Sequence, residues 1–187
     1  MNLDKKDRTI ISMYAKDPNV SQEEIGEMIE LSQPSVAARV RKLKESGALE
    51  TQTGVNPLKM GLSMAKVDVS TNNARAIMDQ FRHCPYFANG FIISGKHNLC
   101  LMFVGENIST LEAIVNTHVR ANPSVSSVEF NIIINAEKDL VLPTVLTPEI
   151  MDTPPCGLAK ECKECKTFHE KRCLGCPNSG KYKGWLY

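Results

Sequence analysis

Three short segments with helical periodicity fill the first fifty residues, and they constrain the fold more than any other feature of the chain. Each segment places its apolar side chains on one face of a helix, so the three helices are predicted to share one small core. These apolar residues are Ile10, Ile11 and Tyr14, then Ile25, Met28 and Ile29, and finally Val36, Val40 and Leu43. Ser21 and Glu24 stand in capping-box register and predict where the second helix begins.

A tight junction separates the second predicted helix from the third. Ser32 can cap the third helix, and Pro34 fits its first turn, because that turn has no intrahelical use for the amide proton that proline lacks. The outer face of this helix carries short hydrogen-bonding groups followed by cations, as a helix in the major groove of DNA requires. The residues predicted to bind double-stranded DNA are Ser32, Gln33, Pro34, Ser35, Arg39, Arg41 and Lys42.

Two roles are expected within this set. Gln33 and Arg39 are predicted to reach base edges, whereas Arg41 and Lys42 hold phosphates. The alternative is a three-helix scaffold with a solvated basic face. The 22 basic and 21 acidic residues of the 187-residue chain nearly cancel, so DNA binding has to come from the placement of charge.

The chain shows no sign of a membrane or secretory segment. No apolar run reaches the roughly 18 to 20 residues that a membrane span needs, and the first residues lack the apolar core of a signal peptide. A cytoplasmic protein without a membrane partner is therefore predicted. In a reducing compartment, the seven cysteines are better interpreted as thiols or metal ligands than as a disulfide framework.

The middle of the chain alternates between strand and helix patterns. Strands are predicted over 66–70, 86–94, 99–104 and 125–135, with helices over 74–81 and around 111–115. This order, strand-helix-strand-strand-helix-strand, is the ferredoxin-like arrangement. So small a sheet leaves one face bare, and we expect a homodimer that places two third helices on one duplex, about one helical turn or a multiple apart.

The predicted fold class is α+β, with five parts. These are a winged helix-turn-helix (1–50), a hinge or wing (51–63), a ferredoxin-like dimerisation and effector domain (64–142), a proline-rich linker (143–155) and a cysteine-rich tail (156–187). A wing or hinge strand is expected over 48–54. The prolines of the linker suit an extended connector that lets the tail fold separately.

The tail contains five of the seven cysteines, which are Cys156, Cys162, Cys165, Cys173 and Cys176. Its two Cys-x2-Cys pairs can each offer both thiolates to one ion, so together they predict a tetrahedral four-sulfur site, with Cys156 as a fifth candidate ligand. Zinc is the favoured metal. A 4Fe–4S cluster is the alternative, because four sulfurs suit either centre and a Cys-Pro step also occurs in ferredoxin-type motifs. Cys84 and Cys100 are expected to be core residues.

Four short runs follow one another in a specific order, namely residues 3–11, 31–36, 39–47 and Asn56-Pro57 with Gly61. From about Leu3 to Pro143, this order resembles the Lrp/AsnC (feast/famine) family of prokaryotic transcription regulators. The resemblance implies DNA binding through the third helix and dimers that assemble further into tetramers or octamers. It also implies a small-molecule effector, such as an amino acid, bound between subunits by the second domain.

Two features depart from the family pattern. Members commonly carry an aspartate in the hairpin near the effector, whereas this chain has Gly95, Lys96, His97 and Asn98 there. These four are the candidate effector-binding residues, and a plain exposed turn is the alternative interpretation. The usual member also lacks the cysteine-rich tail, through which this chain is expected to sense redox state or metal.

An enzyme of the same architecture is the competing prediction. Sirohaem decarboxylases look like this family, so His83, His97 or His118 could be catalytic in such a protein. Tetrapyrrole chemistry needs a basic pocket for many carboxylates, however, and the basic residues of the middle domain are scattered along it. We therefore predict a regulator, with no catalytic residues, over an enzyme.

Overall fold

The computed structural model of the protein describes residues 2–154, 156 and 162–187. The chain divides into two compact units, residues 1–52 and 53–187. The division lies close to the predicted end of the helix-turn-helix at residue 50, but the tail belongs to the second unit. In the part of the chain that the structure describes, no helix is long and apolar enough to cross a membrane.

The N-terminal unit consists of three helices, which are α1 (Lys5–Lys16), α2 (Gln22–Ile29) and α3 (Gln33–Glu45). They share one core, as the periodicity predicted, in which Ile10, Ile25 and Val36 are fully buried. The Ser21 hydroxyl accepts a hydrogen bond from the backbone N–H of Glu24 at 3.1 Å. Ser21 therefore caps α2 at the position that the sequence indicated.

Met28 differs from the prediction, because its side chain is 67% exposed. Helix α2 packs closely through Gly26 instead. A Cβ atom on Gly26 would lie only 2.6 Å from the carbonyl oxygen of Leu31, so no larger residue fits there. The buried stripe of α2 consequently runs through Ile25, Gly26 and Ile29, and Met28 lies beside it.

The junction between α2 and α3 is as tight as predicted. Helix α2 ends at Glu30, whose backbone is left-handed with a φ of 54°. Ser32 is the N-cap of α3, and Pro34 lies in its first turn. The Ser32 hydroxyl lies 2.9 Å from that of Ser35 and does not cap a backbone N–H. The left-handed residue Glu30, the proline in the first turn and the contact between the Ser32 and Ser35 hydroxyls thus hold the start of α3 in place.

The predicted wing or hinge strand is not formed, because residues 48–54 contain no strand. Backbone pairing begins one residue later, where Val55 and Leu142 exchange two N–H to oxygen bonds of 2.9 Å. Gly54 permits this approach, since a Cβ there would collide with the carbonyl oxygen of Leu142 at 1.9 Å. The hinge is therefore irregular chain that is anchored to the sheet domain at one point.

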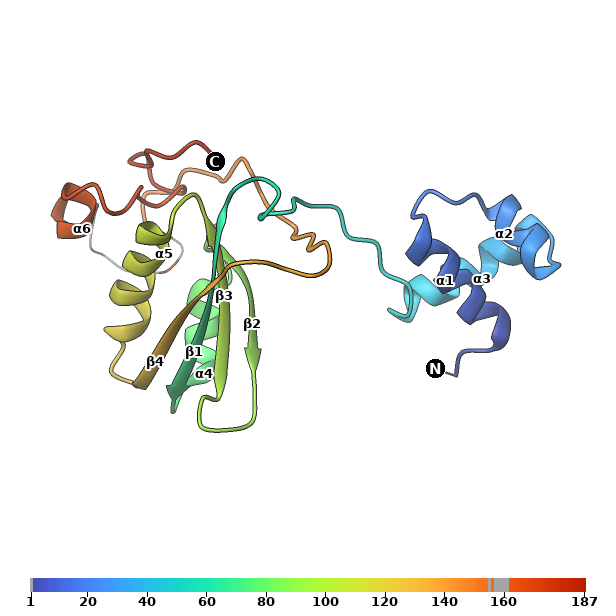
Figure 1. Ribbon diagram of the computed structural model, residues 1–187, viewed down its shortest axis with the longest axis horizontal. Coiled ribbons are helices and arrows are strands. Elements are labelled where there is room, and N and C mark those ends of the chain that lie inside the picture. The colour runs from blue at the N-terminus through green and yellow to red at the C-terminus, as the bar shows by residue number, and fades with distance from the viewer. Residues whose placement is uncertain (1, 155, 157–161) are drawn as a thin grey trace. The chain divides into compact units, whose positions relative to one another are not determined.

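The second unit is built on a four-stranded sheet, on which helices pack (Figure 1). Its strands are β1 (Ser63–Thr71), β2 (Phe87–Ile92), β3 (Leu99–Gly105) and β4 (Val125–Ile133). Its helices are α4 (Ala74–Phe81), α5 (Ile108–Ile114) and the π-helix η1 (Val115–Arg120) that continues α5. The strand order is β2-β3-β1-β4, with every neighbouring pair antiparallel, which confirms the ferredoxin-like prediction.

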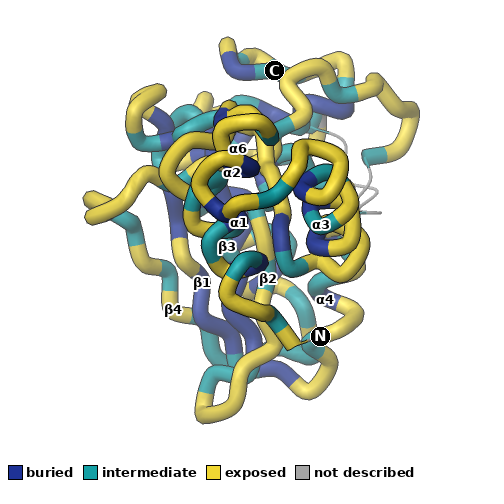
Figure 2. Tube along the Cα trace, turned by 90° about the vertical axis from the view of Figure 1, so that its right-hand side faces the viewer, coloured by how far each residue is buried: buried dark blue, intermediate teal, exposed yellow. Residues whose placement is uncertain are grey.

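The core of the second unit lies between the sheet and its helices. Alternate residues of β1, such as Val67, face this core because successive side chains of a strand point to opposite faces. Leu101 of β3, Ile77 of α4 and Leu111 of α5 are fully buried against them. Figure 2 shows that buried positions are concentrated in β1 and β3, the two central strands.

The cysteine-rich tail packs against the sheet domain. It contains two short helical turns, η2 (Cys162–Glu164) and α6 (Lys166–His169). The Leu174 N–H donates to the Thr110 hydroxyl at 3.1 Å, and Arg172 lies 3.6 Å from the Glu112 carboxylate, so the tail runs beside α5 (Figure 1). The tail therefore contacts the domain and belongs to the same compact unit, and whether it folds separately stays a prediction.

Candidate nucleic-acid interface and cysteine-lined cavity

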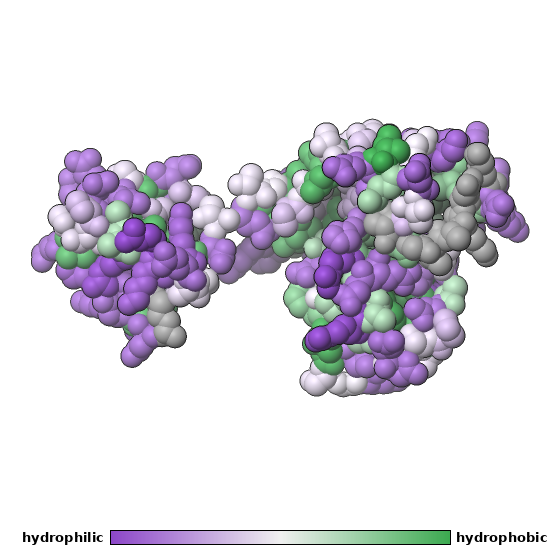
Figure 3. All heavy atoms as spheres, turned by 180° about the vertical axis from the view of Figure 1, so that it is seen from behind, coloured by the Kyte–Doolittle hydropathy of each residue, from purple (hydrophilic) through white to green (hydrophobic). Residues whose placement is uncertain are grey.

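The N-terminal end of α3 is open to solvent. The predicted DNA-binding residues that are exposed there and further along the helix are Ser32, Gln33, Pro34, Ser35, Arg41 and Lys42. Val36, Val40 and Leu43 are buried on the other side of the helix. On the side drawn in Figure 3, the surface of the N-terminal unit is mostly hydrophilic. Helix α3 thus presents short polar groups and then cations to solvent, as a DNA-reading helix requires.

Arg39 lies apart from this exposed set, because its guanidinium group contacts the start of α1. Its Nη1 atom lies 2.7 Å from a carboxylate oxygen of Asp4 and 2.7 Å from one of Asp7. The N–H of Asp7, followed by the Arg39 guanidinium, holds the pKa of Asp4 below its usual value of 3.8. Hydrogen bonds to both carboxylates raise the pKa of Arg39. The structure gives Arg39 a role in joining α1 to α3, and its contact with base edges stays a prediction.

The predicted effector-binding residues form the hairpin between β2 and β3. The Asn98 amide donates to the carbonyl oxygen of Thr71 at 2.7 Å, and its Oδ1 accepts the N–H of Thr71 at 2.9 Å. The carbonyl oxygen of Lys96 accepts the Ser70 hydroxyl at 2.7 Å, while the Lys96 residue itself is exposed. Asn98 is thereby committed to holding the hairpin on β1.

His97 has a different environment from its neighbours in the hairpin. Its side chain is only 17% exposed, and its Nε2 atom lies 3.6 Å from a carboxylate oxygen of Glu129 on β4. That nitrogen is buried and makes no hydrogen bond to any described residue. Gly95, at a φ of 126°, shapes the turn. The four residues share one turn, and of their side chains only that of His97 has a buried nitrogen without a hydrogen bond to a described residue.

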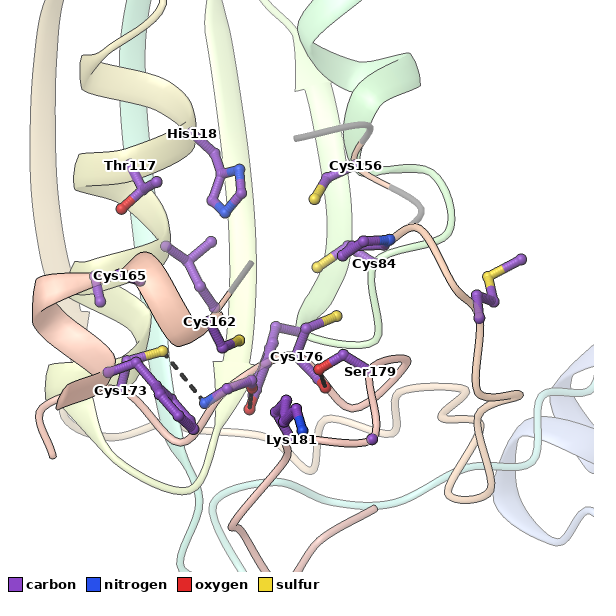
Figure 4. Close-up of a pocket in the computed structure, with 18 of the residues that line it drawn as sticks. Cys84, Thr117, His118, Cys156, Cys162, Cys165, Cys173, Cys176, Ser179 and Lys181 are labelled. Carbon is purple, nitrogen blue, oxygen red and sulfur yellow. Dashed lines mark hydrogen bonds between the residues drawn. The ribbon is translucent and has the colours of Figure 1, made fainter. Parts of the chain in front are cut away.

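Six of the seven cysteines line one cavity between the tail and the sheet domain. The cavity has a volume of about 380 Å³, with Phe81 on the domain side and Phe168 on the tail side. Its cysteines are Cys84 and the five predicted ligands, Cys156, Cys162, Cys165, Cys173 and Cys176. Figure 4 shows the sulfurs of Cys84, Cys156 and Cys176 on one side and that of Cys173 on the other.

A backbone N–H group hydrogen-bonds to the sulfur of one tail cysteine. The N–H of Gly175 donates to the Sγ of Cys173 at 3.4 Å. Burial raises the pKa of the Cys176 thiol to about 11, and the N–H of Ser179 donates to the carbonyl oxygen of Cys176 at 3.0 Å. An N–H donor to sulfur stabilises the thiolate form, which is the form that binds metal.

The donor set of the cavity fits a thiolate-bound metal centre. Zinc and iron–sulfur clusters are commonly bound by four cysteine thiolates, and this cavity is lined by more than four cysteines. Among the residues that the structure describes, no three His, Cys, Asp or Glu side chains are already arranged around a single ion. Because a zinc–sulfur bond is only about 2.3 Å long, binding one zinc ion would draw the tail sulfurs closer together.

Cys84 and His118 also line this cavity, which the sequence did not predict. Cys84 was expected to be a core residue, but its sulfur faces the cavity (Figure 4). His118 projects from η1, and its Nδ1 atom is buried with no hydrogen bond to any described residue. Burial lowers the pKa of His118 to about 4, so the imidazole is neutral. The periodicity of the sequence does not indicate that the tail covers Cys84 and His118. The only signal for this site in the sequence was that Cys84 is a cysteine outside the tail.

Comparisons with known proteins match most of the chain. Residues 3–50 match a family model described as winged helix-turn-helix DNA-binding. The chain is 31% identical over 120 residues to the HTH-type transcriptional regulator LrpC of Bacillus subtilis (strain 168). That alignment spans 62% of this chain and 83% of LrpC.

Solved structures of three regulators resemble this one. B. subtilis LrpC aligns with a TM-score of 0.62 at 26% identity, covering 74% of this chain and 99% of that chain. E. coli AsnC aligns with a TM-score of 0.66 at 14% identity, covering 75% and 98%. The transcriptional regulator NMB0573 of Neisseria meningitidis, in complex with L-Met, aligns with a TM-score of 0.64 at 20% identity, covering 76% and 97%. About a quarter of this chain lies outside each alignment.

Proposed function

The chain belongs to the Lrp/AsnC family of transcription regulators, and from this premise we propose how it reads DNA and what its tail contributes. It is a sequence-specific DNA-binding regulator. The observation that carries the proposed mode of reading is the exposed start of α3, directly after a tight turn. Gln33 and Ser35 there reach base edges, and Arg41 and Lys42 hold phosphates on either side.

The regulator acts as a homodimer formed through the sheet domain, which assembles further into tetramers or octamers. Support comes from β2 and the residue after it, where Phe91, Ile92 and Ile93 are 49%, 55% and 40% exposed. Adjacent exposed apolar side chains mark interaction surfaces. A dimer brings two copies of α3 to one duplex, about one helical turn or a multiple apart. Light scattering of the wild type and of Phe91→Asp tests this assembly.

A small effector, such as an amino acid, contacts the hairpin formed by Gly95, Lys96, His97 and Asn98. The exposed Lys96 side chain offers a cation for a carboxylate, and the buried Nε2 of His97 offers a polar atom without a hydrogen bond. The L-Met complex of the Neisseria regulator supports a ligand of this class. Calorimetric titration with a panel of amino acids tests the assignment, with Lys96→Ala as the comparison.

The tail holds a metal centre with Cys156, Cys162, Cys165, Cys173 and Cys176 as its candidate ligands. Zinc is the first choice and a 4Fe–4S cluster is the alternative. A bound structural zinc contributes on the order of 10 kcal/mol to the folding of a small site, which would secure the tail on α5. A cluster would add sensitivity to redox state, because its charge changes with oxidation. In either case the tail modulates DNA binding, and α3 remains the reader.

Two experiments test the proposed function. The full chain is titrated with duplex DNA at several salt concentrations, where a regulator loses affinity steeply as salt rises, because cations on the protein displace counterions. Absence of duplex binding would contradict the regulator and favour an enzyme, although the matched relatives are named as transcription regulators. An anaerobic absorbance spectrum with metal and sulfide analysis then decides between a coloured cluster and colourless zinc.

A further inference from the structure

Cys84 lies where the tail docks on the sheet domain. The two residues that follow it both bind the tail. The carbonyl oxygen of Pro85 accepts the hydroxyl of Tyr187 at 2.7 Å, and the hydroxyl of Tyr86 donates to the carbonyl oxygen of Gly175 at 2.9 Å. The Cys84 sulfur is consequently fixed at the boundary between the two segments, and it is not an isolated thiol in the interior of the domain.

The Cys84 sulfur faces sulfurs of the tail. Cys156 and Cys176 lie on the same side of the cavity as Cys84 (Figure 4). Cys162, Cys165 and Cys173 line the rest of the same cavity. The thiol of the sheet domain therefore lies in one cavity with all the predicted ligands of the tail.

The chain turns tightly after Cys84, as it does after Cys176. The N–H of Phe87 donates to the carbonyl oxygen of Cys84 at 2.9 Å, and the N–H of Ser179 donates to that of Cys176 at 3.0 Å. The same three-residue backbone turn thus occurs on the domain side and on the tail side of the cavity.

Cys100 provides a contrast within the same domain. It is 7% exposed and lies on β3, outside the cavity. The side chains of Asp68 and Lys66 on β1 lie near its thiol. Cys100 is therefore a more deeply buried cysteine than Cys84, and it does not line the cavity with the tail cysteines.

We propose that Cys84 is a ligand of the thiolate-bound metal centre, so that the centre is shared between the sheet domain and the tail. The inference rests on the proposed metal site and adds its domain-side ligand. His118, whose unpaired Nδ1 lines the same cavity, lies within the domain-side wall beside it. Metal binding then clamps the tail onto α4, α5 and the start of β2. Loss of the metal then frees the tail from the sheet domain, which is also the domain through which the dimer is proposed to form.

The direct test compares Cys84→Ser with Cys100→Ser in the full chain. Both proteins are purified anaerobically, and zinc, iron and acid-labile sulfide are measured per chain, with the sulfur-to-metal absorption bands recorded. We expect Cys84→Ser to lose at least about half of its metal or to show altered bands, while Cys100→Ser matches the wild type. Unchanged metal content and unchanged bands in Cys84→Ser would overturn the assignment.

A second measurement uses the wild-type chain and does not depend on a variant folding. The protein is alkylated with iodoacetamide before and after treatment with a chelator, and the modified cysteines are mapped by mass spectrometry. Modification of Cys84 should rise on metal removal together with that of Cys162 and Cys176, and that of Cys100 should not. A rise confined to the tail cysteines would refute the role of Cys84. A wild type without zinc, iron or sulfide would refute the tail centre itself, and Cys84 with it.

Discussion

The hydroxyl of Tyr86 donates a buried hydrogen bond of 2.9 Å to the carbonyl oxygen of Gly175, 89 residues later in the chain. Burial, followed by the charge of Glu106, raises the pKa of Tyr86 far above its ordinary value, so the hydroxyl stays protonated and remains a donor. This contact joins the start of β2 to the turn between Cys173 and Cys176. The cysteine-rich tail is thus part of the domain that carries it.

Replacing Tyr86 with Phe removes this donor and leaves the Gly175 carbonyl unpaired in a buried site. We expect the second unit to lose about 1 to 3 kcal/mol of unfolding free energy. Chemical denaturation measures the loss. Tyr14→Phe, in the N-terminal unit, serves as the matched control. Equal stability of the Tyr86→Phe protein and the wild type would show that the contact does not hold the tail.

Removal of the tail tests the same relationship on a larger scale. A chain that ends at Thr153 loses Leu186 and Phe168, both buried at 7% and 9% exposure, and uncovers apolar surface on the domain. We expect the second unit to melt at a lower temperature and the N-terminal unit to be unaffected, as followed by calorimetry. A second unit with unchanged stability would support the idea of a separately folding tail.

The contact of Arg39 with Asp4 and Asp7 predicts a structural phenotype. Arg39→Gln should lower the stability of the N-terminal unit by at most about 1 kcal/mol, because the ion pairs are partly exposed. DNA affinity should then fall by a similar factor on cognate and unrelated duplexes. A loss confined to the cognate duplex would reassign Arg39 to base reading.

The acid titration of the N-terminal unit gives an independent check on this contact. The folded-state pKa of Asp4 is lowered from 3.8, so its contribution to stability is present above pH 3.8 and is lost as the pH falls below that value. Arg39→Gln should flatten the acid limb of the stability profile of the wild type. Identical profiles for the two proteins would indicate that the ion pair does not form in solution.

The exposed residues of α3 are predicted to divide into two classes in binding measurements. Gln33→Ala should cost about 1 to 3 kcal/mol on the cognate duplex and little on others, because its amide reads a base edge. Arg41→Ala should weaken binding to all duplexes and reduce the salt slope by about 1, because it neutralises a phosphate. Fluorescence anisotropy at several salt concentrations separates the classes, and a uniform loss for Gln33→Ala would contradict its role.

Much of the fold could be predicted from periodicity and turn chemistry. The helix predicted over 74–81 has those bounds as α4, and the strand order follows from the alternation of strand and helix patterns. Met28 was misplaced because the close approach through Gly26 narrows the buried stripe of α2, which a pattern of apolar residues does not express. The wing strand was also mispredicted because of a long-range contact. Backbone pairing in this region occurs at Val55, and its partner Leu142 is far away in the sequence.

The candidate sites were less predictable because they depend on long-range contacts. The pattern of α3 indicated a cation at Arg39, but it could not indicate that Asp4 and Asp7 would bind it. The spacing of the tail cysteines predicted a thiolate site, whereas the position of Cys84 in the same cavity follows only from the docking of the tail on the domain. Local patterns therefore identify the chemistry of a site more readily than all of its members.

The measurement that tests the central claim most directly is a binding selection from a library of random duplexes with the full-length protein. A sequence-specific regulator should enrich one motif with two related half-sites, separated by about 10 base pairs or a multiple, and Gln33→Ala should lose the preference at positions within each half-site. A final pool no richer in any motif than the starting library would contradict sequence-specific reading by α3.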